Sequence, residues 1–266
     1  MAIRYKEKYG DWALITGATS GIGAEIANQL ADKGFNIVLV ARKKQDLEAH
    51  TIAIKKKYGV AAMYISADLS TQEGMEKVTN IQKPIGLLVL AAGVEVNGAF
   101  EKTSLEDELQ MVQLNVTSTL HLSHHFSKEM VARKKGGILF VASLAGHMVN
   151  PYFSNYAATK AYVLQLGASL YGELKPKGID ISVLSPGLTN TNMMAGSNVD
   201  WNKLPMKEMT PQQTAKIAID GLPKRFLSIP GTWNKMLTWV ANFSPLGIQA
   251  KINGMLIRRA IDEVRL

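Results

Sequence analysis

The chain has 266 residues, of which 47% are apolar and 20% are charged, values typical of one large α/β domain. It contains no cysteine, which excludes a disulfide framework and a thiolate metal site, and its net charge of +8 comes from scattered basic clusters that lack the interleaved aromatic residues of a nucleic-acid surface. The polar start Met1–Lys8 lacks the apolar core of a signal peptide and no apolar run reaches the length of a membrane span, so we expect a cytoplasmic protein with no nucleic-acid partner.

From residue 12 to residue 185, apolar β-rich runs alternate with amphipathic helical runs. The predicted strands are Trp12–Thr16, Asn36–Val40, Ala62–Ala67, Leu87–Ala91, Gly137–Ala142 and Ile179–Leu184. The predicted helices are Gly21–Lys33, Lys43–Tyr58, Thr71–Ile81, Ser104–Asn115, Ser118–Arg133 and Tyr152–Leu174. Because the strands are apolar throughout and are separated by helices, the pattern predicts a doubly wound, Rossmann-type parallel sheet of about seven strands with helices on both faces, in a single domain.

After residue 185 the pattern changes. Residues 188–204 are polar and irregular, which predicts a mobile substrate loop. Thr210 and Pro211 are typical of a helix start, that helix is expected to end at Gly221, and Phe226–Ile229 is a candidate last strand. The tail, residues 233–266, has two apolar helical stretches broken at Ser244-Pro245. We expect residues 188–266 to form the substrate loop and a lid; a subunit contact and a membrane-facing surface remain alternatives for the tail.

A glycine-rich turn, Thr16–Gly23, lies between the first strand and the first helix, where a dinucleotide pyrophosphate docks in this fold class. The spacing is Gly-x-x-x-Gly-x-Gly, and the expected cofactor contacts are Gly17, Thr19, Ser20, Gly21, Ile22 and Gly23. Arg42 and Lys43 follow the second strand, at a position where an acidic residue binds the ribose of NAD and an arginine accommodates the 2′-phosphate of NADP. This favours NADP(H) over NAD(H).

Tyr156 and Lys160 lie four residues apart on the predicted helix Tyr152–Leu174 and therefore share one face. A phenol titrates near pH 10 and is a weak acid or base at neutral pH, whereas a neighbouring ammonium lowers its pKa. The pair is therefore a candidate proton donor. A Tyr-x-x-x-Lys pattern alone is common, and it gains meaning from the glycine turn that precedes it in the chain.

Together with Asn115 and Ser143, these residues resemble the short-chain dehydrogenase/reductase family over about residues 12–191. The resemblance implies that Asn115, Ser143, Tyr156 and Lys160 are catalytic, and that Ser143 and Tyr156 bind the substrate. It adds the following cofactor contacts to those named above: Asp68, Leu69, Ala92, Gly93, Tyr156, Lys160, Pro186, Gly187, Thr189 and Thr191. One departure is Ala91, which stands where the family has an asparagine that braces the sheet.

By this resemblance we expect an NADP(H)-dependent oxidoreductase that interconverts a ketone or aldehyde and an alcohol, with Tyr156 as the general acid or base. The start Tyr9–Gly17 resembles reductases of 3-ketoacyl and steroid-like carbonyls, and the apolar tail suggests a hydrophobic or acyl substrate. The family commonly pairs through two long helices, here Leu109–Phe126 and Tyr152–Leu174, which implies a homodimer or homotetramer.

The alternatives are a non-catalytic NADP-binding regulator and a membrane-surface lipid carbonyl reductase. Three histidines, His121, His124 and His125, share one predicted helix but lack a metal-binding spacing, so no metal site is expected.

Overall fold

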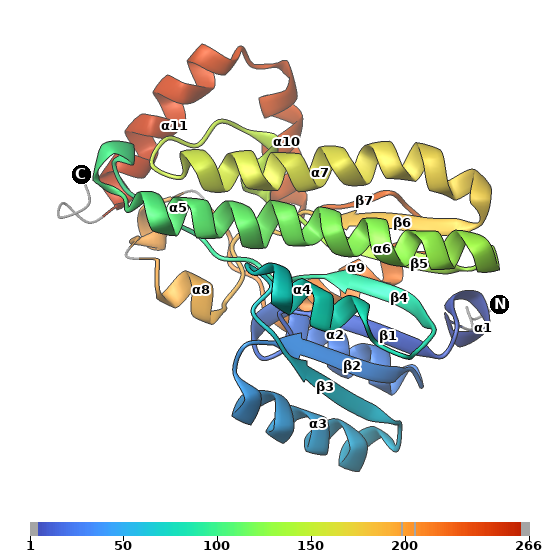
Figure 1. Ribbon diagram of the computed structural model, residues 1–266. Coiled ribbons are helices and arrows are strands. Elements are labelled where there is room, and N and C mark those ends of the chain that lie inside the picture. The colour runs from blue at the N-terminus through green and yellow to red at the C-terminus, as the bar shows by residue number, and fades with distance from the viewer. Residues whose placement is uncertain (1–4, 198, 205, 262–266) are drawn as a thin grey trace.

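The computed structural model describes residues 5–197, 199–204 and 206–261 (Figure 1). The first four residues, residue 198 in the predicted substrate loop and the last five residues of the predicted tail lie outside this part. Within it, seven parallel strands form one sheet in the order β3-β2-β1-β4-β5-β6-β7. The strands are β1 (Trp12–Thr16), β2 (Asn36–Ala41), β3 (Ala62–Ser66), β4 (Ile85–Leu90), β5 (Gly136–Val141), β6 (Ile179–Leu184) and β7 (Leu227–Ser228). Each predicted strand agrees with these bounds to within two residues, and the predicted fold class is confirmed.

Helices connect the strands and extend beyond them. They are α1 (Tyr5–Tyr9), α2 (Gly21–Asp32), α3 (Lys44–Tyr58), α4 (Gln72–Thr79), α5 (Leu105–Val112), α6 (Ser118–Arg133), α7 (Ser154–Leu174), α8 (Asn192–Ala195), α9 (Pro211–Gly221), α10 (Thr232–Phe243) and α11 (Leu246–Ala260). Shorter 3-10 turns are η1 (Phe100–Lys102), η3 (Leu144–His147), η4 (Lys175–Lys177) and η5 (Trp201–Lys203), and η2 (Gln113–Thr117) is a π-helical turn. The predicted start of α9 is confirmed in detail, because Thr210 caps it with Pro211 in its first turn.

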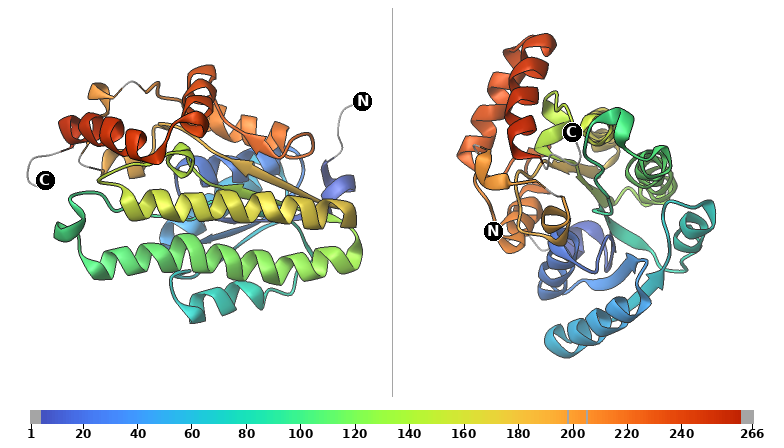
Figure 2. Two further views of the ribbon diagram at one scale, coloured as in Figure 1. Left: turned by 90° about the horizontal axis from the view of Figure 1, so that it is seen from above. Right: turned by 90° about the vertical axis from the view of Figure 1, so that its left-hand side faces the viewer.

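The sheet is covered on both faces, with α2, α3 and α9 on one side and α4, α6 and α7 on the other (Figure 2). Successive residues of a strand point to opposite faces. In β1, Ile15 therefore packs in the core with α2 and α9, whereas Leu14 packs in the core with α6 and α7. The central strands β4 and β5 have no polar side chain and are buried throughout, as expected for strands covered on both faces, whereas β6 also buries Asp180 and Ser182.

The order of the strands in the sheet determines where the binding crevice lies. The chain runs outward from β1 to β2 and β3, then returns to place β4 on the other side of β1. In open parallel sheets, ligands bind at the carboxyl ends of the strands where the order reverses. Here that point lies between β1, which is followed by the glycine turn, and β4, which is followed by Ala91–Gly93.

The predicted helices Ser104–Asn115 and Ser118–Arg133 are not separated. They join through the π turn η2 into one long helical run that lies alongside α7 (Figure 1). No glycine or proline interrupts residues 113–118. The Ser118 hydroxyl donates to the Leu114 carbonyl (2.5 Å) and the Thr119 hydroxyl to the Asn115 carbonyl (2.8 Å), which satisfies backbone acceptors in the turn. Such π turns are frequent at functional sites, and this one carries Asn115.

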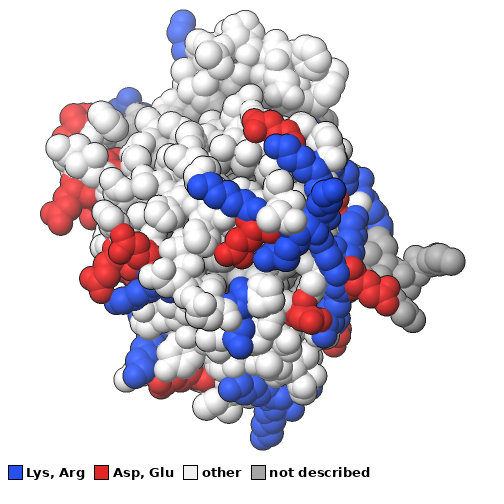
Figure 3. Space-filling model, turned by 45° about the vertical axis from the view of Figure 1, so that its right-hand side comes forward, with Lys and Arg blue, Asp and Glu red and all other residues white. Residues whose placement is uncertain are grey.

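Beyond the sheet, α10 and α11 form a helical pair that we call the cap helices. They project from the body of the molecule, and in a space-filling view the lobe they form is almost free of charged atoms (Figure 3). The Gln249 side-chain amide donates to the carbonyls of Ala241 and Ser244 (both 2.8 Å), which fixes the corner between the two helices. The predicted break at Ser244-Pro245 is therefore present. Among the described residues, no helix is long and apolar enough to cross a membrane.

Candidate active site

A cavity of about 630 Å³ lies at the carboxyl ends of the strands. Its walls come from the turns after β1 to β6, from described residues between 188 and 206, and from the inner side of the cap helices. Every predicted cofactor contact lines it: Gly17, Thr19, Ser20, Gly21, Ile22, Gly23, Arg42, Lys43, Asp68, Leu69, Ala92, Gly93, Tyr156, Lys160, Pro186, Gly187, Thr189 and Thr191. Of the predicted catalytic residues, Ser143, Tyr156 and Lys160 also line it, whereas Asn115 lies behind its wall.

The glycine turn brings the start of α2 against the end of β4. Gly17 has φ +67°, and a Cβ there would lie 2.9 Å from the carbonyl oxygen of Ala91. A Cβ at Gly23 would lie 2.4 Å from the carbonyl oxygen of Gly17. Among the described residues, no acidic side chain occupies the first turn of α2, and the Ser20 hydroxyl makes no capping hydrogen bond. The first amides of α2 are therefore available to an anion, and the turn fits a dinucleotide pyrophosphate.

Arg42 and Asp68 lie at the far end of the same cavity, after β2 and β3. The backbone of Arg42 is held by the Ser66 hydroxyl, which donates to its carbonyl (2.9 Å), while its side chain is exposed. Burial pushes the pKa of Asp68 upward, but hydrogen bonds from Ser70 and the Arg42 charge outweigh it and lower that pKa. Asp68 is therefore a carboxylate beside a cation, an arrangement suited to an adenosine with a phosphate on its ribose.

Tyr156, Ser143 and Lys160 meet at the centre of the cavity. Tyr156 and Lys160 are one helical turn apart on α7, and both are more than 90% buried. The hydroxyls of Tyr156 and Ser143 are hydrogen-bonded, and the Ser143 oxygen also accepts from the amide of Ala145 (3.1 Å). The Lys160 Nζ lies 5.8 Å from the Tyr156 ring centroid and donates to the carbonyl of Val141 (3.1 Å). Two polar hydroxyls therefore face the position where a substrate oxygen can lie.

The electrostatics of this group differ from the sequence-based expectation. Burial, reinforced by the charge of Glu95, raises the pKa of Tyr156, while the Ser143 hydrogen bond lowers it only in part. Burial lowers the pKa of Lys160 to about 8, against the opposing effect of Glu95. The expected lowering of the tyrosine pKa by Lys160 is therefore not seen, because desolvation of the phenolate dominates. Tyr156 is a protonated phenol at neutral pH, the form that donates a proton.

Asn115 supports the centre from behind. Its Oδ1 accepts from the amide of Val94 (3.0 Å), and its Nδ2 donates to the Val94 carbonyl (2.9 Å) and to the Thr159 hydroxyl (3.1 Å). It therefore ties the loop after β4 to α7, next to Lys160. A Cβ at Gly93 would lie 3.2 Å from Asn115 Oδ1 and 3.3 Å from Lys160 Nζ, so Gly93 packs tightly against both polar side chains.

This arrangement has counterparts in known proteins. Residues 11–202 match the family model described as short chain dehydrogenase. The chain belongs to this family. It is 30% identical over 247 residues to the 7β-hydroxysteroid dehydrogenase of Collinsella aerofaciens, covering 89% of this chain and 93% of that protein.

Two solved structures of short-chain dehydrogenases resemble this one closely. That of the enzyme from Sphingobium yanoikuyae in complex with NADPH has a TM-score of 0.79 at 30% identity, covering 87% of this chain and 94% of the other. That of a 7β-hydroxysteroid dehydrogenase, solved to explain its stereoselectivity, has a TM-score of 0.84 at 27% identity, covering 94% and 98% of the two chains.

The sequence-based analysis missed two acidic residues that line the cavity of this short-chain dehydrogenase: Asp46, in the first turn of α3, and Glu95. Glu95 follows the Ala92-Gly93 turn after β4. Burial raises the pKa of its carboxyl to about 7, although a hydrogen bond from Asn97 (3.3 Å) and the charge of Lys160 both oppose this. The signal in the sequence is a single glutamate between Val94 and Val96. Only the fold shows that its side chain points toward the cavity.

The other end of the cavity is apolar. It is lined by Met148, Phe153, Met193, Met194, Trp201, Leu204, Met206, Leu237, Leu256 and Ile257, with Asn150 and Asn253 among them. These residues come from η3 and the loop after it, from the predicted substrate loop, which contains α8 and η5, and from the cap helices. Asn97 connects this end to the sheet, because its Nδ2 also donates to the carbonyl of Ser197 (2.8 Å). The apolar end and the glycine turn are parts of one cavity, and a Cβ at Gly21 would lie 2.9 Å from the Thr191 side chain.

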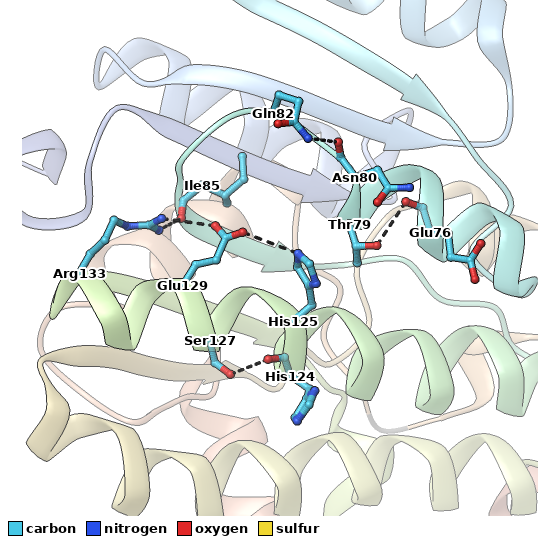
Figure 4. A network of polar contacts seen from close by, with 10 residues as sticks. All are labelled: Glu76, Thr79, Asn80, Gln82, Ile85, His124, His125, Ser127, Glu129 and Arg133. Atoms are coloured by element: carbon cyan, nitrogen blue, oxygen red, sulfur yellow. Dashed lines mark hydrogen bonds and ion pairs between the residues drawn. The ribbon is translucent and has the colours of Figure 1, made fainter.

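The histidines of α6 do not line the cavity; His124 is exposed, and His121 and His125 are half-buried. His125 faces Glu129, which also contacts Arg133, and the Ser127 hydroxyl donates to the His124 carbonyl (Figure 4). Arg133 in turn donates to the carbonyl of Ile85 at the start of β4 (2.7 Å). These contacts brace α6 against the sheet. In the described part of the chain, no group of three or more His, Asp or Glu residues is placed to hold a metal ion.

Proposed function

We propose that this short-chain dehydrogenase is an NADP(H)-dependent oxidoreductase that reduces a bulky hydrophobic ketone to an alcohol and catalyses the reverse reaction. The observation that carries the proposal is the meeting of the Tyr156 and Ser143 hydroxyls and the Lys160 ammonium in one cavity with the glycine turn and Arg42. The complex of the Sphingobium relative with NADPH supports the choice of cofactor.

The residues of the cavity fit a dinucleotide. Gly17 and Gly23 leave room that any Cβ would fill, and the amides of α2 lack an acidic neighbour. Arg42 and Lys43 supply two cations for a ribose phosphate, and Asp68 with Leu69 would hold the adenine side. Thr189 and Thr191, after Pro186-Gly187, would hold the nicotinamide side. When bound, the nicotinamide supplies or accepts a hydride.

Side chains of the protein donate the proton and stabilise the negative charge that develops on the substrate oxygen. Tyr156, protonated at neutral pH, donates its proton to the oxygen of the reduced carbonyl. Ser143 donates a hydrogen bond to the same oxygen and orients it, which stabilises the charge that develops there. Lys160 places a positive charge beneath the phenolate that forms, and Asn115 holds the backbone around Lys160 in place. Because Tyr156 and Lys160 share one helical turn, their separation is fixed by α7.

The proposed substrate is large and apolar because the substrate end of the cavity is built almost entirely from methionine, leucine and aromatic side chains. A hydroxysteroid, as in the names of the relatives, has a rigid apolar body that suits such walls. The described cavity residues between 188 and 206, together with the cap helices, would form the lid over this body. We expect the cap to determine which ketone binds and the sheet half to determine the chemistry.

We further propose a homodimer or homotetramer in the cytoplasm. The outer faces of α5, α6 and α7 lie side by side and expose Leu105, Leu109, Leu120 and Tyr171. Burying such side chains against a second copy removes apolar area from water and favours association.

The test is NADPH oxidation, followed by absorbance, with a panel of steroid ketones, 3-ketoacyl thioesters, sugars and small aldehydes. We expect turnover with the bulky apolar ketones. Tyr156→Phe should be inactive with the same substrate while still binding NADPH. An enzyme that prefers small polar carbonyls would contradict the substrate proposal, and a fully active Tyr156→Phe variant would contradict the mechanism.

A further inference from the structure

The outer side of α10 is an exposed apolar stripe. Trp233, Met236, Trp239, Val240 and Phe243 recur at spacings of three or four residues and are between 43% and 74% exposed. At 100° per residue they occupy one third of the helix circumference. The rings of Trp239 and Phe243 contact each other, with centroids 5.1 Å apart. A stripe of this kind on an exposed helix is typical of a surface that meets an apolar partner.

The next helix continues this surface. On α11, Ile248, Ile252 and Met255 follow a spacing of four and three residues, and Leu246 precedes them at the corner; all are at least 51% exposed. Lys251, Arg258 and Arg259 are exposed on the same side of the helix. We call the exposed apolar residues of α10 and α11 the cap face.

The cap helices themselves carry cations and no carboxylate, and an acidic residue, Asp200, lies beside the end of α11, where its amide donates to the carbonyl of Ala260 (2.7 Å). Between Asp220 and residue 261 the sequence has no Asp or Glu, while Lys235, Lys251, Arg258 and Arg259 lie on the cap helices themselves. In the space-filling view the projecting lobe is almost uniformly uncharged, whereas the body below it carries both signs (Figure 3). Amphipathic helices with aromatic and aliphatic residues on one side and only cations beside them lie in the headgroup region of anionic bilayers.

The inner side of the cap helices contacts the body of the molecule and the cavity. The side-chain oxygen Oε1 of Gln249 accepts from the amide of Val149 (3.1 Å), and the Asn253 side chain donates to the carbonyl of Val149 (2.7 Å). Leu237, Leu256 and Ile257 line the cavity. The cap helices are therefore fixed to the body by one side, and the cap face is the opposite side, at the rim of the substrate end.

We propose that the cap face binds the surface of an anionic lipid bilayer, so that an apolar substrate dissolved in the bilayer enters the cavity beside it. The apolar residues enter the headgroup and acyl boundary, and Lys235, Lys251, Arg258 and Arg259 meet the lipid phosphates. A second copy of the chain suits this face less well. A two-fold contact through it would bring eight cations together without a carboxylate from the same helices, whereas anionic headgroups neutralise them.

The experiment is co-sedimentation of the full chain with sucrose-loaded vesicles, of phosphatidylcholine alone or of phosphatidylcholine mixed with phosphatidylserine. We expect binding to the mixed vesicles that weakens as salt is added, and weak binding to phosphatidylcholine alone. Phe243→Ser should lower the partition coefficient roughly tenfold, because it removes one large buried apolar side chain from the bound state. Ile52→Ser, on the distant helix α3 and 66% exposed, is the matched control and should bind as the native chain does.

A second pair of variants tests the charge. The triple change Lys251→Gln, Arg258→Gln and Arg259→Gln should lower binding to the mixed vesicles about 100-fold, since each basic residue near an anionic surface contributes about a factor of five. Lys55→Gln, Lys56→Gln and Lys57→Gln change the net charge equally at the end of α3 and should change binding far less.

The proposal fails if the native chain does not sediment with the mixed vesicles, or if both control variants lose binding as strongly as the cap variants. It also fails if Phe243→Ser binds vesicles normally but dissociates an oligomer in analytical ultracentrifugation, because the cap face is then a subunit contact. Tyr156→Phe should bind vesicles like the native chain, so this outcome is independent of whether the proposed reaction is correct.

Discussion

The sheet half of the molecule differs in construction from its cap, by which we mean the cap helices and the described residues between 188 and 206. At the carboxyl ends of β1 to β6 the cavity is formed largely by turns, in which glycines set the backbone and a few polar side chains are more than 90% buried. In the cap, the cavity is formed by apolar side chains on helices that face it with one side and solvent with the other. The sheet half is suited to a constant cofactor and one proton transfer, whereas the cap can vary with the substrate.

Few polar contacts join the two halves. Asn97 joins the loop after β4 to Ser197, and Val149 joins the loop after η3 to Gln249 and Asn253. The comparison therefore predicts that changes in the sheet half alter catalysis or cofactor binding, while changes in the cap alter substrate preference alone.

The largest expected effect is in the sheet half. Tyr156→Phe removes the proton donor and should lower kcat/KM for the best ketone by about 10²–10⁴-fold, with the dissociation constant of NADPH unchanged. Steady-state kinetics and fluorescence titration measure the two quantities. Tyr162→Phe, on the same helix but outside the cavity wall, should behave like the native enzyme. Equal losses in both variants would show that α7, and not the phenol, is affected.

A change at Glu95 tests the contact between the sheet half and the cap, because Glu95 accepts a hydrogen bond from Asn97, which also donates to Ser197. Its carboxyl has a pKa of about 7 in the folded protein, against an ordinary value of 4.5. Between these values the unfolded chain has released the proton that the folded chain retains, so stability should fall as pH rises from about 4.5 to 7 and then level off, by roughly 3 kcal/mol in all. Glu95→Gln should remove this loss.

Chemical denaturation of the cofactor-free protein at several pH values measures the Glu95 effect. Glu101→Gln, on the exposed turn η1, is the control and should keep the native pH dependence. If Glu95→Gln and Glu101→Gln give the same profile, the Glu95 carboxyl does not hold a proton in the folded protein at neutral pH.

The next largest effect is expected on the relative affinity for NADPH and NADH. Arg42→Asp should weaken NADPH binding by about 10- to 100-fold, because a hydrogen-bonded charge pair with the 2′-phosphate contributes roughly 1.5–3 kcal/mol, and it should improve binding of NADH. Titration with each cofactor measures the ratio. Lys44→Asp makes the same change of charge two residues further along the chain, outside the cavity wall, and should leave the ratio unchanged. Native enzyme with equal affinity for both cofactors would contradict the NADP(H) proposal.

The smallest effect is expected in the cap. Leu256→Ala removes apolar wall from the substrate end and should raise KM for a bulky ketone roughly tenfold, with little change for a small ketone or in NADPH affinity. Ile252→Ala lies one turn earlier on the outer side of α11 and should leave kinetics in lipid-free buffer unchanged. A loss of NADPH affinity in Leu256→Ala would mean that the two halves are not separable.

Most of the sheet half could be predicted from the sequence. Apolar runs of five or six residues separated by helical periodicity specify a parallel sheet, and the carboxyl ends of parallel strands meet at one edge. Residues as far apart in the chain as Gly17, Arg42, Ser143 and Tyr156 could therefore be placed in one cavity before the structure was known. The separation of Tyr156 and Lys160 follows from helix geometry alone.

The remainder depends on contacts between distant segments. Glu95 and Asn97 follow no local pattern, and Asn97 meets Ser197 across 100 residues of sequence. The π turn at Asn115, with the Ser118 and Thr119 hydroxyls bonded to backbone carbonyls in it, is a local irregularity that helical periodicity does not report. The pKa of Tyr156 rises instead of falling because burial, a property of the packed protein, outweighs a charge inferred from spacing.

The sequence by itself thus determined the sheet, the glycine turn and the Tyr156–Lys160 pair, because each is specified within a few neighbouring residues. Long-range packing sets the protonation states of Tyr156 and Glu95, and it selects the side of the cap helices that faces the cavity. An amphipathic helix shows that it has two sides, but packing decides where each side lies.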